Sequence, residues 1–147
     1  MFRSIVVGTD GSETAQKAVD AAVELARLTS AKLELVSAYE PVTGERLRDD
    51  AREVPADAQW MVNPREDVDA TLARAAERVG AAGVDSRTYP REGDPADAIL
   101  DVAEELGSDL IVVGNKGMTG AKRFLLGSVP NKISHHAPCS VMIVRTS

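Results

Sequence analysis

Short apolar runs bounded by turn residues alternate along this chain with segments of helical periodicity. The apolar runs cover residues 5–7, 33–36, 110–113 and 141–144, and a more polar run covers residues 84–89. Apolar side chains at helical spacing lie between them, near residues 13–27, 66–82, 94–106 and 128–137. Apolar strands separated by helices are typical of a parallel sheet that is covered on both faces. We therefore predict an α/β fold: a single domain over residues 1–147, with an open five-stranded parallel sheet and helices on both faces.

Residues 40–64 interrupt this alternation. They contain Pro41, Gly44, Pro55 and Pro64 together with a run of charged side chains. Most connections between elements have a median length of about 4–6 residues, and much longer ones are usually functional or mobile. We therefore expect a long connection after the second strand.

The charged residues are divided unevenly along the chain. Residues 1–109 hold all 23 acidic side chains and 12 basic ones, whereas residues 110–147 hold five basic side chains and no acidic one. The net charge of −6 argues against a general nucleic-acid binder, which needs a broad basic face. A local basic segment on an acidic protein suits a small anion. A chance loss of acids from a buried C-terminal strand would produce the same split.

Cysteine content and hydropathy indicate where the protein works. The single cysteine, Cys139, cannot form an intrachain disulfide. No apolar stretch approaches the roughly 18 residues of a membrane span, and the N-terminus has no secretory signal pattern. We predict a cytoplasmic protein with no membrane partner.

Two loops are predicted to lie side by side. Ligands of open parallel sheets bind beyond the carboxyl ends of the strands, where the chain switches from one face to the other. This brings the turn after the first strand, Gly8-Thr9-Asp10-Gly11-Ser12, next to the segment that follows the fourth strand. We expect a binding site between them.

The segment after the fourth strand has the composition of a phosphate-binding loop. Residues 114–128 contain four glycines, and their end leads into a helix N-terminus, where backbone N–H groups and the helix dipole favour anions. Ser128 is predicted to cap this helix and to donate its hydroxyl to a phosphate, and Lys132 follows the helix start. The loop is not a Walker A motif, because no glycine precedes Lys-Ser or Lys-Thr. A glycine-rich turn without a ligand is the alternative. The glycines and the cations that would add charge are Gly114, Gly117, Gly120, Gly127, Lys116, Lys122 and Arg123.

The spacing of these residues resembles that of the universal stress protein family. Gly114, Gly117, Gly127 and Ser128 match the family's nucleotide-binding signature, G-x2-G-x9-G-[S/T], and the resemblance extends over essentially the whole chain. The resemblance implies an adenine nucleotide alpha hydrolase-like sheet with strand order 3-2-1-4-5. It also implies binding of ATP or a related adenine nucleotide such as cAMP, with Mg²⁺ or Mn²⁺ as a possible companion.

The resemblance assigns a role to each matching residue. Thr9 and Ala38 would line the adenine slot next to Gly8, and Asp10 would meet the ribose hydroxyls or a polar group of adenine. Val113 and Gly114 would flank the ribose. Phosphates would be held, mostly by backbone N–H groups, by Gly117, Gly127, Ser128 and Val129, with charge from Lys116. Pro130 departs from members that carry a hydroxyl there, and this favours a shorter or cyclic phosphate.

The resemblance further implies a homodimer that pairs through the last strand, Val141, Met142, Ile143 and Val144, whose apolar edge would otherwise be an aggregation hazard. We expect a stress-response regulatory protein. A slow ATP hydrolase or transferase using the same pocket, and a ligand-free interaction module, are the alternatives. We predict no catalytic residue, because the glycine loop offers no base. We also predict no metal site of the protein's own, because His135 and His136 have no ligand cluster around them in the sequence.

Overall fold

The predicted alternation of strands and helices is confirmed by the computed structural model, which describes residues 1–39, 65–115 and 126–146. The expected long connection over residues 40–64 lies outside the described residues. In chain order the elements are β1 (Ser4–Gly8), α1 (Glu13–Thr29), β2 (Lys32–Tyr39), α3 (Arg65–Ala81), β3 (Ser86–Glu92), α4 (Pro95–Leu106), β4 (Leu110–Gly114), α5 (Ser128–His136) and β5 (Ser140–Val144).

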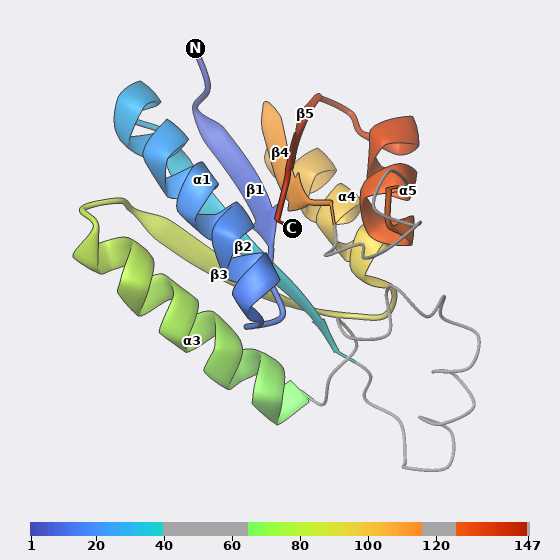
Figure 1. The fold of residues 1–147 in the computed structure, drawn as a ribbon, viewed down its shortest axis with the longest axis horizontal. Helices are drawn as coiled ribbons and strands as arrows, with labels where there is room; N and C mark the ends of the chain where they lie inside the picture. Colours follow the sequence, from blue (N-terminus) through green and yellow to red (C-terminus); the bar gives the residue numbers. More distant parts are fainter. Residues whose placement is uncertain (40–64, 116–125, 147) are drawn as a thin grey trace.

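The strands form one parallel sheet in the order β3-β2-β1-β4-β5, as predicted (Figure 1). The central strand β1 pairs with both of its neighbours, and Val7 lies opposite Leu35 of β2 and Val112 of β4. β3 and β5 are the edge strands. The carboxyl ends of β1, β2 and β4 therefore lie next to one another at one end of the sheet.

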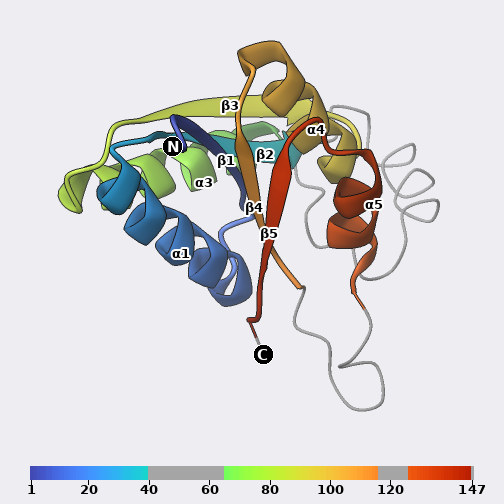
Figure 2. The same cartoon turned by 90° about the horizontal axis from the view of Figure 1, so that it is seen from above.

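Helices cover both faces of the sheet and enclose two separate cores (Figure 2). Because successive side chains of a strand point to opposite faces, Ile5 and Val7 face α1 and α3, whereas Val6 faces α4 and α5. All three side chains are fully buried. Continuous apolar strands are thus explained by burial on both sides.

Helix boundaries follow local capping chemistry. Ser12 caps α1 by accepting a hydrogen bond from the Ala15 N–H at 3.2 Å, and Asp94 caps α4 by accepting one from the Asp97 N–H at 2.9 Å. α4 ends at Gly107, whose left-handed conformation (φ 61°) suits glycine. Among the described residues, no helix has the length and the apolar character needed to cross a membrane.

The third strand differs most from its sequence prediction. It covers Ser86–Glu92 rather than residues 84–89, and it carries exposed polar side chains because it lies at an edge of the sheet. Val84, which the sequence placed at the start of this strand, instead lies in the connection before it and is buried in the core under α1 and α3. Its burial explains the apolar signal at this position.

The chain changes from one face of the sheet to the other at the carboxyl ends of β1 and β4. After β1 the chain passes to α1 on one face of the sheet, and after β4 it returns through α5 on the other face (Figure 2). This is the switch point at which open α/β sheets bind ligands. The predicted neighbourhood of the two loops is therefore consistent with the observed topology.

Candidate functional site

The turn after β1 is shaped by its own side chains. Thr9 is 2% exposed, and its N–H donates to the Val36 carbonyl at 2.9 Å, which continues the pairing with β2. The Thr9 Oγ1 accepts a hydrogen bond from the Gly11 N–H at 3.1 Å, and the Asp10 Oδ1 accepts one from the Ser12 N–H at 2.9 Å. These local bonds hold the half-buried Asp10 carboxylate at the carboxyl end of the central strand.

Gly11 is required by the geometry of this turn. Its φ of +86° lies in the left-handed region, and an added Cβ would lie 3.3 Å from both Cγ2 and Oγ1 of Thr71 on α3. A side chain there would cause both backbone strain and crowding against Thr71. The turn is thus fixed by backbone conformation as well as by hydrogen bonds.

The start of α5 differs from the starts of α1 and α4. Its N-cap is Gly127 (φ −64°), which has no side chain to accept from the first amides, and the Asn131 N–H donates to the Gly127 carbonyl at 3.0 Å. The prediction that Ser128 caps this helix is wrong: Ser128 is the first helical residue, and its backbone N–H belongs to the first turn. Pro130 contributes no N–H to that turn. The amides of Ser128 and Val129 are thus the first N–H groups at this helix end.

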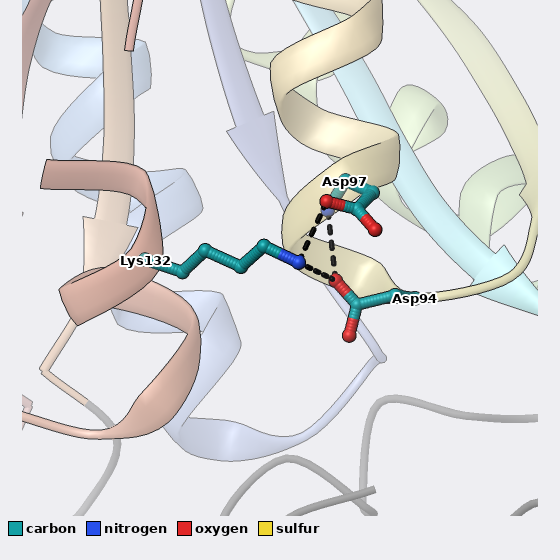
Figure 3. Close-up of polar contacts among 3 residues, drawn as sticks. All are labelled: Asp94, Asp97 and Lys132. Carbon is teal, nitrogen blue, oxygen red and sulfur yellow. Dashed lines mark hydrogen bonds and ion pairs between the residues drawn. The ribbon is translucent and has the colours of Figure 1, made fainter. Parts of the chain in front are cut away.

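Lys132 does not serve as a free cation for this helix end. Its Nζ lies 2.7 Å from Oδ1 of Asp97 and 3.5 Å from Oδ2 of Asp94, both at the start of α4 (Figure 3). Hydrogen bonding to Asp97 and the charges of both aspartates raise the pKa of Lys132 above its ordinary 10.5. The two aspartates thus balance the charge of Lys132 within the protein. This differs from the charge pattern of the sequence, which suggested that Lys132 adds positive charge at the start of α5.

The remaining predicted residues divide into those that the structure describes and those that it does not. Ala38, Val113 and Val129 are buried members of the core under α4 and α5, at the carboxyl ends of β2 and β4 and the start of α5. Gly8 and Gly114 end β1 and β4, the two strands that flank the switch point. Residues Lys116, Gly117, Gly120, Lys122 and Arg123 lie outside the described residues.

Sequence reasoning missed two groups of residues around these elements. Lys132 of α5 pairs with Asp94 and Asp97 at the start of α4, which lie 38 and 35 positions away in the sequence, and no local spacing predicts this pairing. Asn115 was passed over, although its side chain is 8% exposed and accepts two hydrogen bonds from Thr146, 31 positions away. A polar residue directly after an apolar strand was the signal available in the sequence.

Comparison with known proteins places the chain among related sequences and structures. The model of the Universal stress protein family matches residues 1–145. Universal stress protein Rv1636 of Mycobacterium tuberculosis is 38% identical over 151 residues, covering 99% of this chain and 98% of that protein. Universal stress protein YxiE of Bacillus subtilis is 37% identical over 158 residues, covering 99% and 100%.

A solved structure agrees with these relatives. The crystal structure of a universal stress protein in complex with cAMP has 34% sequence identity and a TM-score of 0.75, and the match covers 99% of both chains. The resemblance first indicated by the spacing of Gly114, Gly117, Gly127 and Ser128 is confirmed at the level of the family. By its matched span, its identities and its strand order, the chain belongs to the universal stress protein family.

Proposed function

We propose that this protein binds an adenine nucleotide at the switch point between β1 and β4. The observation that carries the proposal is the start of α5, where the Gly127-Ser128 end of the glycine signature forms a helix N-terminus with a glycine cap. Backbone N–H groups and the helix dipole favour a phosphate at such a position. The 34%-identical relative that was solved in complex with cAMP supports the same ligand class.

Each half of the nucleotide has its own residues in this proposal. Adenine lies between Thr9 and Ala38, next to Gly8, and the Asp10 carboxylate accepts a hydrogen bond from the ribose or from the base. Val113 and Gly114 flank the ribose. The backbone N–H groups of Gly127, Ser128 and Val129 donate to the phosphate. The proposal also assigns Lys116 and Gly117 to the phosphate, and both lie outside the described residues.

The phosphate end favours a nucleotide with few negative charges. Pro130 supplies neither an N–H nor a hydroxyl in the first turn of α5. Lys132, one turn further along α5, is paired with Asp94 and Asp97, so it adds little net charge for a triphosphate. We therefore propose that cAMP or AMP binds more tightly than ATP.

A divalent cation enters this proposal only as a companion of the phosphates. Mg²⁺ usually keeps several waters and binds one or two carboxylates together with phosphate oxygens. Asp10 is the acidic side chain in the turn after β1 and fits this donor chemistry. Titration of nucleotide in the presence of Mg²⁺, Mn²⁺ or EDTA tests whether the cation strengthens binding.

We further propose a homodimer that pairs through β5. Met142 and Ile143 on this edge strand are 38% and 37% exposed, so both sides of the edge present apolar surface that a second copy would cover. The opposite edge, β3, carries Pro90 and the exposed Arg87, features that discourage strand pairing. This contrast supports β5 as the edge that meets a second copy by two-fold symmetry.

In this proposal the protein is a cytoplasmic stress-response regulator whose nucleotide occupancy is its signal. A slow hydrolase or transferase would use the same pocket, and an interaction module would use none. Acid release of copurified nucleotide followed by mass spectrometry, then calorimetric titration of the stripped protein with cAMP, AMP and ATP, tests the proposal. An adenine nucleotide recovered and rebound supports it, and no binding of any of the three overturns it. Multiple-turnover phosphate release from ATP would favour the hydrolase.

A further inference from the structure

Asn115 follows β4 directly and is tied to the residues that follow β5. Its backbone N–H donates to the Val144 carbonyl at 2.9 Å. Its side-chain Oδ1 accepts two hydrogen bonds from Thr146, one from the backbone N–H and one from the hydroxyl, both at 2.9 Å. Both side chains are buried, Asn115 at 8% and Thr146 at 3% exposure. Buried bonds of this kind are costly to break, because the partner loses its hydrogen bond without gaining water.

The side chain of Asn115 stands in for a backbone carbonyl. Gly114 lies opposite Val144, and the Asn115 N–H continues this ladder to the Val144 carbonyl. In a parallel ladder extended by one more step, the Thr146 N–H would donate to the Asn115 carbonyl. It donates instead to Oδ1. The sheet pairing therefore ends on the side chain of Asn115.

Thr146 is also held from the other side of the switch point. The Lys17 Nζ, on α1, donates to the Thr146 carbonyl at 3.0 Å. α1 begins directly after the turn that carries Thr9 and Asp10. Thr146 thus joins the exit of β4 to the helix that follows β1, and these are the two elements on either side of the proposed site.

We propose that Asn115 and Thr146 are positioning residues for the nucleotide site. This inference rests on the proposed function. Neither residue touches the nucleotide; their hydrogen bonds hold the exit of β4, at Gly114 and Asn115, next to the ribose. Loss of the Thr146 hydroxyl leaves the strand order intact and loosens this exit.

Three variants separate positioning from stability. Thr146→Val removes the hydroxyl at nearly constant shape, and Thr146→Ser keeps it. Thr29→Val is the matched control, because it removes a threonine hydroxyl that donates to the Leu25 carbonyl at 2.7 Å near the far end of α1. For cAMP, measured by calorimetry, we expect Thr146→Val to raise the Kd about fivefold or more, and both other variants to stay within about twofold of the wild-type protein.

A second measurement needs no nucleotide. Amide hydrogen exchange at Asn115, followed by NMR or mass spectrometry, is expected to accelerate about tenfold in Thr146→Val and to stay unchanged in Thr29→Val. A wild-type Kd in Thr146→Val, or an equal loss of affinity in Thr146→Ser, overturns the positioning role. If the wild-type protein binds no adenine nucleotide, the proposed function fails, and the exchange measurement alone decides whether the two residues fix the exit of β4.

Discussion

Replacing Asp94 tests how the start of α4 is held next to α5. The Asp94 Oδ2 accepts the Asp97 N–H at 2.9 Å as a helix cap and lies 3.5 Å from the Lys132 Nζ as an ion pair (Figure 3). Asp94→Ala removes both interactions. Asp94→Asn keeps a good capping side chain and removes only the charge. The two variants therefore divide the contribution of Asp94 into its two parts.

The structure gives the expected size of each part. Loss of a helix cap costs about 1 kcal/mol in the free energy of unfolding. The ion pair contributes less than about 0.5 kcal/mol, because Asp94 and Lys132 are 35% and 43% exposed and Lys132 keeps Asp97 at 2.7 Å. We expect Asp94→Ala to lose about 1–1.5 kcal/mol, which corresponds to a Tm lower by roughly 3–5 °C, and Asp94→Asn to lose less than about 0.5 kcal/mol.

Urea unfolding measures both variants, with an unchanged dependence on urea concentration as the sign of an intact fold. An equal loss in Asp94→Asn and Asp94→Ala would refute the capping argument and assign the effect to charge. No loss in Asp94→Ala would refute both parts.

The same pairing has a predicted pH dependence, tested with Lys132→Met. The pKa of Lys132 is raised in the folded state, so its ion pairs stabilise the fold fully at neutral pH. This stabilisation is lost as the pH rises past that raised pKa, above 10.5. Between neutral and alkaline pH, the difference in unfolding free energy between the wild-type protein and Lys132→Met should therefore stay constant until the pH rises above 10.5 and shrink there, and a difference that already shrinks between pH 7 and pH 9 would contradict the assignment.

Three further predictions concern other parts of the molecule. Gly11→Ala should lose about 1–2 kcal/mol of stability, because its Cβ meets Thr71 at positive φ, whereas Gly80→Ala, with open space around it, should lose none; equal unfolding midpoints would contradict this. Burial raises the pKa of the Cys139 thiol, so its alkylation by iodoacetamide at pH 7 should be slower than that of an exposed cysteine, and a faster rate would count against it. Met142→Lys should shift the proposed dimer to monomer in analytical ultracentrifugation, and an unchanged sedimentation coefficient would exclude β5 as the interface.

The fold followed from the sequence where burial dictates the residue type. β1 and β4 are buried on both faces, so their apolar runs were visible and their pairing at the centre of the sheet is the arrangement that buries them. β3 was displaced in the prediction because an edge strand needs few apolar side chains. The turn at residues 82–83, directly before Val84, is not visible to a pattern that counts only apolar positions.

The candidate site could be predicted from the sequence only in part. The glycine spacing singled out Gly114, Gly127 and Ser128, and the structure places Gly114 at the end of β4 and the other two at the start of α5. The partners of Lys132 and of Asn115 come from distant elements and depend on how α4, α5 and the residues after β5 meet in space. The sequence marks Asn115 only as a polar residue directly after an apolar strand, and it contains no signal for which distant residues these side chains contact.

Binding of cAMP by Gly127→Val tests most directly whether the start of α5 holds the phosphate. The added side chain would cover the amides at the helix start, while a φ of −64° is accessible to valine. Gly80→Val, on α3 with nothing within 4 Å of an added Cβ, is the control. Calorimetric titration should give a Kd at least tenfold higher for Gly127→Val and an unchanged Kd for the control. A wild-type Kd in a folded Gly127→Val would contradict a phosphate site at this helix start.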